Sequence, residues 1–422
     1  MAKFTNNFTF KIVVATILGI LFGIIFQEYM SYIDIIGDIF LRLIQMSIIL
    51  LVMGQIIEAV GNLNPKQLGK IGYKTFLIFF ISSLLAAGFG LITGLIFKPG
   101  LGVNSSALIS GDNLQLEHSL SVKETILNFF PNNVISSMAQ GSIMQVIVFS
   151  LLFGVALSFV RVENSKNNIL ETIVNFNEVI LRLIRLVMKI VPLGIFALIS
   201  ATIAKLGVSV LIPLLKYLLI YGVATFIFLF LWILVCSIYC KVSIARLISN
   251  MLRMSIVALT TTSSAVTLPI ALSDSEEKLG IGERISKLVL PLGMSLNSNG
   301  SAMHMAITII TIAQIYGVVY SPSELIYIVI LATLASLANA VVPGASLVSL
   351  AIVIPQMGLP LESIALFAGV DYFVGMLRTI LNVNSDTFSA LLVAKGENEL
   401  NYDIFYGTPK NPDPGLVGDN NH

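Results

Sequence analysis

Two acids, an arginine and an asparagine recur at helical spacing in an otherwise apolar stretch near the C-terminus. They are Asp371, Arg378, Asn382 and Asp386, and Gly375 belongs to the same series. At ~100° per residue these five positions fall within about 80° of one another, so a helix would present them on one face. Ionisable groups at membrane depth are costly and normally line a substrate or ion pathway. The series therefore predicts a transport site, with a salt-bridged contact between helices as the simpler alternative.

The composition places this stretch in a membrane. Hydrophobic residues make up 56% of the 422-residue chain, charged residues make up 11%, and the mean hydropathy is +0.93. These values are typical of an integral membrane protein. The net charge of +1 indicates no polyanionic partner, so nucleic-acid binding is excluded, and no Gly-rich phosphate loop is present to drive transport with ATP. Cys236 and Cys240, one helical turn apart with no neighbouring His, are predicted to be buried reduced thiols.

Apolar runs of about 20 residues predict the elements that position the site. Charge-poor runs occur at 12–26, 43–57, 75–97, 144–160, 190–204, 217–240, 254–273, 288–326 and 325–361, followed by the polar helix to residue 394. The run 325–361 is too long for one span and has Pro343-Gly344 at its middle. The run 254–273 is centred on Ser and Thr residues, which lipid would not tolerate. We therefore expect an all-α polytopic membrane protein with eight transmembrane helices and two re-entrant helical hairpins.

The placement of charge predicts the orientation. Lys66, Lys70 and Lys74 lie in the second connection, whereas the first and third connections are rich in acids. Because Lys and Arg are enriched in cytoplasmic loops, the second connection is expected inside the cell and both termini are expected to be cytoplasmic. The chain is therefore predicted to be a multi-pass protein of the cell membrane. A further connection is expected at residues 316–322, which contain Gly, Ser and Pro.

Four polar segments are expected to converge near the middle of the bilayer. They are the serine-rich tip with Ser263, Ser264 and Thr267, the segment 297–301, the tip 342–345, and the stripe on the last helix. Half-helix N-termini at such tips attract carboxylates, and half-helix C-termini attract cations. Arg378 offers a planar fork to a carboxylate, and Asn382 and Asp386 offer hard oxygen ligands to a small cation. Close helix packing through small residues is the alternative for each tip taken alone.

In their order along the chain, these motifs resemble the glutamate transporter (dicarboxylate/amino acid:cation symporter) family. The matching sequences are Ser-Ser-x-x-Thr-Leu-Pro from 263, Leu-Pro-Leu-Gly from 290, Asn-x-x-Gly-Ser from 297, Val-Pro-Gly-Ala from 342 and Asp-x6-Arg-Thr-x2-Asn-Val-x2-Asp from 371. The resemblance covers nearly the whole chain and implies a homotrimer. Residues 1–70 and 101–205 would form the trimerising scaffold. Residues 71–100 and 206–400 would form an elevator-like transport domain, and residues 401–422 a cytoplasmic tail.

The resemblance also implies roles for individual residues. The substrate-binding residues would be Ser263, Ser264, Thr267, Ser301, Val342, Gly344, Gly375, Arg378, Thr379 and Asn382. The sodium ligands would be Ser82, Ser83, Leu296, Asn297, Asn299, Asn382 and Asp386. The implied function is secondary active symport of a small carboxylate with Na⁺, with H⁺ as the alternative coupling ion.

Two departures from the family pattern bear on substrate and ion. The family's amino acid carriers have an acid at the position of Gly375, where it binds the substrate ammonium, and another at the position of Asn299, where it binds sodium. We therefore expect a C4-dicarboxylate in preference to an acidic amino acid, and fewer coupled sodium ions. The alternative is that Asp371 binds an amine. His304 is interpreted as a hydrogen-bonded structural residue rather than a proton carrier.

Two other function classes compete with a symporter. An intramembrane hydrolase would use Asp371 with Asp386, or Ser263 or Ser264 with His304. The two carboxylates are ~22 Å apart along a helix, too far to share a proton, and no Gly-x-Ser-x-Gly elbow surrounds the serines. A passive anion pore is the second class, but two tips closing on one buried arginine favour occlusion. We therefore expect a carrier and not an enzyme.

Overall fold

The computed structural model describes residues 8–26, 30–62, 65–101, 127, 130–164, 168–187, 189–207, 211–337 and 345–407. Within these ranges the fold is helical, with one isolated β-bridge between Ile281 and Leu400. The helices are α1 Phe8–Ile25, α2 Met30–Gly61, α3 Pro65–Phe97, α5 Val134–Ala139, α6 Ile143–Glu163, α7 Ile169–Val187, α8 Val191–Leu206, α9 Leu211–Cys240, α10 Ile244–Thr261, α11 Ser264–Glu277, α12 Glu283–Leu296, α13 Asn299–Ile315, α14 Pro322–Ser336, α15 Ala345–Val353, α16 Ile364–Ala368, α17 Asp371–Gly396 and α18 Tyr402–Tyr406. The expected all-α fold class is confirmed.

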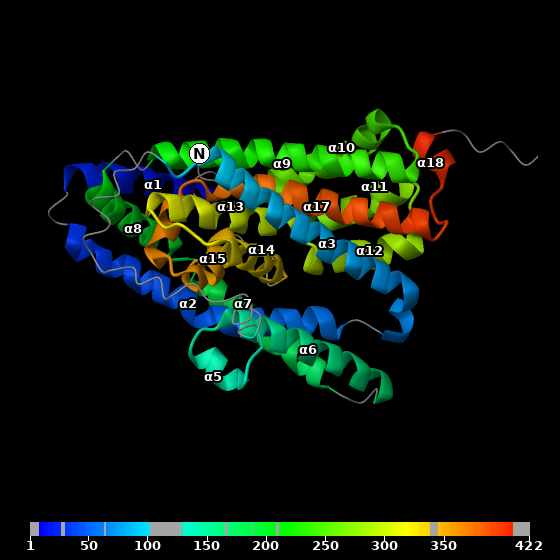
Figure 1. The fold of residues 1–422 in the computed structure, drawn as a ribbon, viewed down its shortest axis with the longest axis horizontal. Helices are drawn as coiled ribbons and strands as arrows, with labels where there is room; N and C mark the ends of the chain where they lie inside the picture. Colours follow the sequence, from blue (N-terminus) through cyan, green and yellow to red (C-terminus); the bar gives the residue numbers. More distant parts are fainter. Residues whose placement is uncertain are drawn as a thin grey trace, which may run out of the picture.

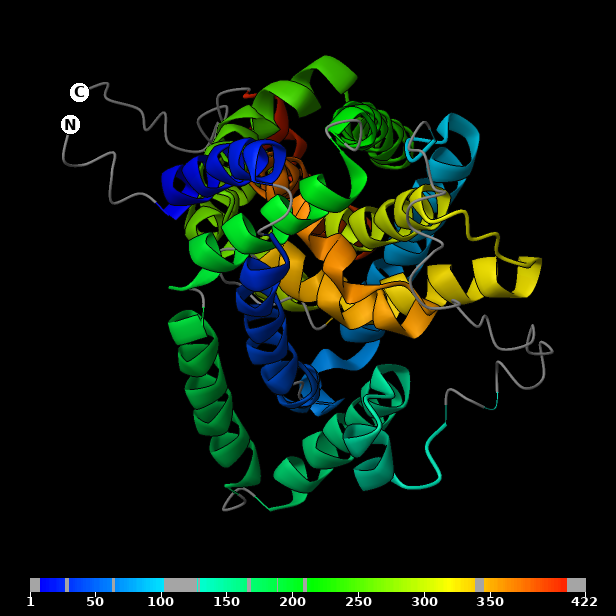
Figure 2. The same ribbon diagram turned by 90° about the vertical axis from the view of Figure 1, so that its left-hand side faces the viewer.

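The helices pack in two neighbouring groups (Figure 1). In the first group, α1 packs on α8, and α2 packs on α6, α7 and α8. In the second group, α13 packs against α3, α14 and α17, and α17 also contacts α9, α10 and α12. Figure 2 shows α6 and α7 at the edge of the molecule, on the far side of α2 from the second group. The polar stripe of α17 thus lies within the second group.

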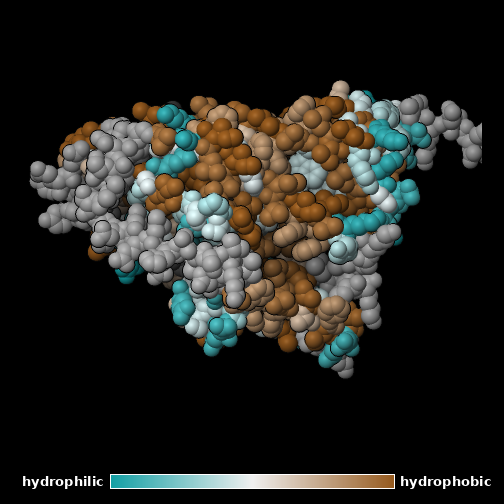
Figure 3. Space-filling view, viewed as in Figure 1, coloured by the Kyte–Doolittle hydropathy of each residue, from teal (hydrophilic) through white to brown (hydrophobic). Residues whose placement is uncertain are grey.

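Two helices show how burial follows from sequence. Every residue of α13 from Asn299 to Ile315 is buried except Gln314, as expected for a helix that is apolar on all sides and surrounded by others. In contrast, α9 exposes Leu215, Leu219 and Val223 along its outer face, each by more than half. Figure 3 shows that apolar residues cover the middle of this side of the molecule, with hydrophilic residues gathered at the end where α18 lies. Such a surface suits hydrocarbon and not water.

The number of membrane spans stays a prediction. Among the described residues, three helices are long and apolar enough to cross a membrane, namely Ile71–Phe97 within α3, α6 and α9. A fourth is added if the bent pair Leu361–Ala368 and Asp371–Gly396 counts as one span. Helices α8 and α14 are apolar but shorter than a full span. The positions of the helix breaks, unlike the number of spans, follow directly from the helix bounds.

The serine-rich run contains the break that its composition predicts. Helix α10 ends at Thr261 and α11 begins at Ser264, with Thr262 in the left-handed region at φ 52°. Ser263 caps α11, its Oγ accepting from the Val266 amide at 3.4 Å. The two helices pack against each other and extend beyond the expected run 254–273 at both ends.

The connection expected at residues 316–322 is confirmed, because α13 ends at Ile315 and α14 begins at Pro322. Ser321 and Glu324 form a capping box there, in which each residue satisfies a backbone donor of the other. The second predicted tip, with Val342 and Gly344, lies outside the described residues. Its flanking helices, α14 and α15, contact each other.

Two features of the helices were not predicted from the sequence. The polar segment 297–301 contains a helix break, because α12 ends at Leu296 and α13 begins at Asn299. The intervening Asn297 and Ser298 are non-helical, and the Asn297 side chain bonds to α17 and α3, contacts that spacing along the chain does not reveal. Helix α7 was also missed, since its four charged residues hide it from a search for charge-poor runs.

Candidate functional site

The five polar-stripe positions lie together on α17, as their spacing predicts. Asp371, Gly375, Arg378, Asn382 and Asp386 are all buried within the helix Asp371–Gly396. Thr379, another predicted substrate residue, is buried beside Arg378. The helices packed around α17 are α3, α9, α10, α11, α12, α13 and α15. The stripe therefore faces protein along its length.

Arg378 has the donors that a carboxylate needs. It is 7% exposed, and its Nε and Nη1 have no hydrogen-bond partner among the described residues. The groups that act on it electrostatically are Asp371 on its own helix and Tyr221 and Tyr217 on α9. Nε and Nη1 donate along different edges of the planar guanidinium, and a carboxylate that binds at either edge can accept from one of them.

Gly300 brings the start of α13 directly onto Arg378. A Cβ at Gly300 would lie 2.3 Å from the Arg378 carbonyl oxygen, so only glycine fits this contact. The Gly300 amide donates to Asn382 Oδ1 at 2.7 Å, and Tyr221 donates to the Gly300 carbonyl at 3.0 Å. Ser301, the next residue, is fully buried with its Oγ unpartnered among the described residues. Asn382 and Ser301 thus lie where α13 meets α17, beside Arg378.

Most of the predicted cation ligands lie in one hydrogen-bonded chain. Asp386 Oδ1 accepts from Asn297 Nδ2 at 2.9 Å, and Asn297 Oδ1 accepts from Ser82 Oγ at 3.0 Å. Asn299 Oδ1 accepts from Ser82 Oγ at 3.2 Å and from Ser83 Oγ at 2.9 Å. All five residues are buried. The chain of bonds joins α3, the break between α12 and α13, and α17.

These ligands suit a small hard cation. Leu296 ends α12 and Asn297 is non-helical, so the Leu296 carbonyl lacks an onward helical partner and is available to a ligand. Carboxylate, amide, hydroxyl and backbone oxygens are the donors that hard cations take. In the part of the chain that the structure describes, no group of three or more His, Cys, Asp or Glu residues could hold a metal ion. Asp386 is the only negatively charged residue in this network of hydrogen bonds, since Asn299 is neutral.

The serine-rich tip lies beside the stripe at Gly375. Among the described residues, a Cβ at Gly375 would have Thr262 as its nearest neighbour, at an ordinary van der Waals distance of 3.9 Å, so a methyl group fits there without a clash. Thr267 is buried and donates to the Ser263 carbonyl at 2.8 Å, while Ser263 and Ser264 are half-buried. The structure therefore brings the first tip and the stripe together. Val342 and Gly344 are the predicted site residues that lie outside the described ranges.

A pair of tyrosines behind Arg378 was missed by sequence reasoning. Tyr217 lies with its hydroxyl 2.6 Å from His304 Nδ1 and 2.9 Å from Thr308 Oγ1, and it stacks on Tyr221. The sequence feature that could have revealed them is that two tyrosines lie four residues apart in an apolar helix, which places both hydroxyls on one face. His304 is hydrogen-bonded at Nδ1, as expected, but its buried Nε2 has no partner among the described residues.

The two cysteines belong to the packing of α9 on α17. Cys236 and Cys240 are free and fully buried, which confirms the prediction of reduced thiols. Their sulfur atoms lie 3.8 Å from the carbonyl oxygens of Phe388 and Leu391 on α17.

Comparison with known proteins gives consistent matches along the chain. The profile of the sodium:dicarboxylate symporter family matches residues 8–396. The chain is 34% identical over 402 residues to the proton/sodium-glutamate symport protein of Bacillus caldotenax, covering 93% of this chain and 94% of that protein. It is 32% identical over 416 residues to the proton/glutamate-aspartate symporter of Escherichia coli (strain K12), covering 94% and 95%. It is 29% identical over 406 residues to the C4-dicarboxylate transport protein of Bacillus subtilis (strain 168), covering 94% and 95%.

Proposed function

This chain belongs to the sodium:dicarboxylate symporter family, and on that premise we propose that it carries a small C4-dicarboxylate into the cell together with sodium. Family membership makes it a cation-coupled transporter of carboxylates in the cell membrane and not an enzyme. The relatives are named for glutamate, aspartate or C4-dicarboxylate transport, and for proton or sodium coupling. The substrate and the coupling ion therefore have to be argued from this chain's own residues.

Arg378 is the proposed anchor of one substrate carboxylate. The observation that carries the proposal is its burial with two guanidinium N–H groups unpartnered among the described residues. Ser301 lies one residue from the glycine that contacts Arg378, and its unpartnered hydroxyl can donate to the same anion. The serine-rich tip, with Ser263 and Ser264, offers the start of α11 to the second carboxylate.

Gly375 supports a dicarboxylate over an amino acid. Among the described residues, the atoms within 4 Å of a Cβ at Gly375 belong to Thr262, so no acid there is in position to pair with an ammonium group. Burying an unpaired ammonium costs several kcal/mol, so a zwitterionic substrate would bind poorly there. The second candidate is an acidic amino acid, and Asp371 is the residue that favours it. Asp371 lies one helical turn before Gly375, is buried, and has one carboxylate oxygen unpartnered among the described residues.

Sodium coupling is proposed at the chain of bonds that ends on Asp386. This carboxylate can offset the charge of one buried cation, and the surrounding amide and hydroxyl oxygens can complete its coordination. Asn299 supplies an oxygen but no charge, so a second cation between Asn299 and the two α3 serines would be weakly held. Fewer sodium ions are therefore expected than in carriers with an acid there. A proton at His304 is the alternative.

The two packing groups support an elevator mechanism in a homotrimer. Helices α1, α2, α6, α7 and α8 are the proposed scaffold and trimer interface. Helices α3 and α9 to α17, which hold every described candidate site residue, are the proposed transport domain. Movement of the second group past the first would carry the site across the membrane without dismantling it.

Ligand-induced stabilisation of the purified protein tests substrate and ion together, because a ligand that binds only the folded state raises its stability. Succinate, fumarate and malate should raise the melting temperature in sodium buffer, and less in potassium or choline buffer. Equal stabilisation by aspartate or glutamate would contradict the dicarboxylate proposal. Counterflow in proteoliposomes separates a carrier from a pore, since a pore cannot exchange a labelled solute with saturation.

A further inference from the structure

Beyond α17 the chain folds back across the end of the helices that carry the site. Residues 397–407, which we call the C-terminal clasp, include α18 and lie beside α10, α11 and α12 (Figure 1). Residues 401–407, which the sequence predicts as the start of a cytoplasmic tail, are bonded to other helices, and Phe405 is fully buried although most of this segment is exposed. The clasp therefore belongs to the folded body.

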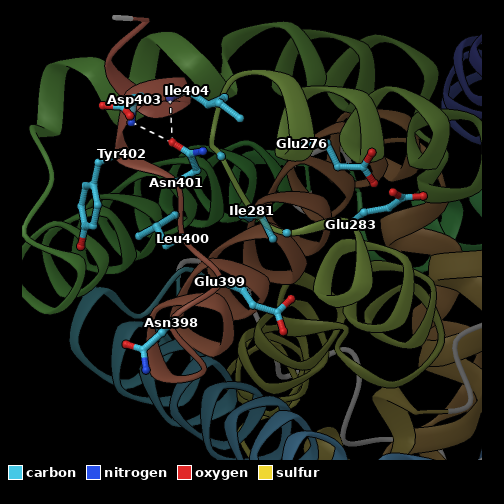
Figure 4. A pocket seen from close by; sticks show the side chains of 12 residues that line it. Glu276, Ile281, Glu283, Asn398, Glu399, Leu400, Asn401, Tyr402, Asp403 and Ile404 are labelled. Carbon is cyan, nitrogen blue, oxygen red and sulfur yellow. Dashed lines mark hydrogen bonds between the residues drawn. The ribbon is translucent and has the colours of Figure 1, made fainter. Parts of the chain in front are cut away.

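The clasp is joined to the connection between α11 and α12 by backbone contacts. Leu400 forms the isolated bridge with Ile281, and Figure 4 shows these two side chains beside the pocket that the clasp borders. The Asn401 amide donates to the Gly280 carbonyl at 2.7 Å, and the Gly282 amide donates to the Glu399 carbonyl at 2.9 Å. These bonds fix the base of α11 to the residues that continue α17.

The clasp is also bonded to α10. Asn250 donates from one amide nitrogen to the Phe405 carbonyl at 3.0 Å and to the Lys278 carbonyl at 2.7 Å, so it joins α18, α10 and the end of α11. Arg246 donates to the Tyr406 carbonyl at 3.0 Å. Both arms of the serine-rich tip are therefore held at their bases by the same short segment.

Contacts with three other helices anchor the clasp itself. Glu397 is paired with Lys74 on α3, and Glu399 is paired with Arg284 on α12 at 2.8 Å. Tyr402 donates to the Cys240 carbonyl at the end of α9 at 2.7 Å. The clasp is thus bonded to α3, α9 and α12 as well as to the α10–α11 pair.

We propose that the clasp positions the serine-rich tip by holding α10 and α11 against α17, so that Ser263 and Arg378 move as one body. At the tip itself, the hydrogen bonds of Ser263 and Thr267 stay within the α10–α11 pair, and Gly375 meets Thr262 only at van der Waals distance. Farther down, Ser255 on α10 donates to Asn384 on α17 at 2.9 Å, and the clasp holds the bases of both arms, so the position of the tip depends on contacts below it. The inference rests on the proposed function only in taking this tip as one side of the substrate site.

A substitution at Gly280 is expected to displace the clasp from the connection between α11 and α12. It has φ +67°, and a Cβ would lie 2.1 Å from the Asn401 carbonyl oxygen, so Gly280→Ala must push the clasp away. Gly317 is the matched control, because it has φ +69° but no atom within 4 Å of a Cβ. Gly317→Ala therefore introduces the same backbone strain without the clash.

Amide hydrogen exchange of the purified full-length protein, without substrate, is the direct measurement. Gly280→Ala should speed exchange in α10 and α11 by about tenfold, as expected when a few hydrogen bonds are lost, and leave α13 unchanged. In proteoliposomes preloaded with labelled succinate, the same variant should show efflux that neither saturates nor requires sodium. Unchanged exchange in α10–α11, an equal increase in α13, or the same result in Gly317→Ala would overturn the proposal.

A milder pair of variants covers the case in which Gly280→Ala does not fold. Arg284→Gln breaks the ion pair with Glu399, whereas Lys287→Gln breaks an exposed pair with Glu283 on the same helix that does not involve the clasp. Only Arg284→Gln should speed exchange in α10–α11, and equal effects of the two variants would contradict the inference. These exchange results do not depend on the substrate. Failure of every acid to stabilise the wild type would therefore count against the proposed function alone.

Discussion

Two helix breaks border α17, and they are built differently. The break at Asn297–Ser298 is fully buried, and its side chains bond to α3 and α17. The break at Thr262–Ser263 is half-buried, its hydrogen bonds stay within α10 and α11 among the described residues, and it meets α17 at Gly375 at van der Waals distance. The first break is bonded to two other helices, which suits the fixed geometry of an ion site. The second is held to α17 by packing alone, which suits a segment that must admit a substrate.

The largest effect is expected from replacing Arg378, the residue that lies between the two breaks. Arg378→Ala should lower uptake of the anionic substrate by at least about a hundredfold, because loss of one partner from a buried charge pair typically costs about 3–5 kcal/mol. Labelled succinate uptake in proteoliposomes is the measurement. Arg378→Lys should recover little of it, since an ammonium cannot form two parallel bonds to a carboxylate. Unchanged affinity in Arg378→Ala would refute the anchor.

The next prediction concerns the buried break and its single charge. Asp386→Asn should raise the sodium concentration for half-maximal uptake by at least about tenfold, because no other acid in the hydrogen-bonded chain offsets a cation. Asn299→Asp adds a carboxylate next to Ser82 and Ser83 and should steepen the sodium dependence instead. If wild-type uptake ignores sodium and follows a pH gradient that His304→Gln abolishes, proton coupling replaces this assignment.

Adding one methyl group tests the difference in packing between the two breaks. Gly300→Ala places a Cβ 2.3 Å from the Arg378 carbonyl oxygen and should destabilise the protein by about 1–3 kcal/mol, as overpacked sites do. Gly375→Ala meets only Thr262, at 3.9 Å, and should leave the melting temperature nearly unchanged. Thermal unfolding of the two variants in detergent is the measurement. Equal losses of stability would show that the second break is as tightly packed as the first.

A change of substrate preference is expected from a charge added at the second break. Gly375→Asp has room for its Cβ among the described residues and supplies a negative charge beside the serine-rich tip. Competition by aspartate against labelled succinate should improve by about 10- to 100-fold, since an ammonium would gain a buried partner. Gly375→Asn, of nearly the same volume but neutral, is the control. If both variants behave alike, the amine is recognised elsewhere, with Asp371 as the next candidate.

Sequence reasoning worked where the determining pattern is local. The stripe from Asp371 to Asp386 could be placed on one helix face because helical periodicity depends only on spacing. The break before Pro322 was predictable from turn-forming residues. The break at Asn297 was not, because it depends on bonds to Ser82 and Asp386, which are distant in the sequence. The clasp was missed for the same reason, since each of its anchors joins residues from separate helices.

The hydroxyl of Ser82 has one proton but three oxygens within reach, namely the Phe79 carbonyl and the side-chain oxygens of Asn297 and Asn299. Ser83 supplies a second proton, to Asn299 alone. Asn299 is thus supplied by Ser83, and the single Ser82 proton can go to Asn297 or to the Phe79 carbonyl but not to both at once. A cation has no such limit, because it can accept several lone pairs at once. The oxygens of Ser82, Asn297 and Asn299 can therefore coordinate one ion together, and Ser82→Ala would remove one of these ligands while leaving every formal charge in place.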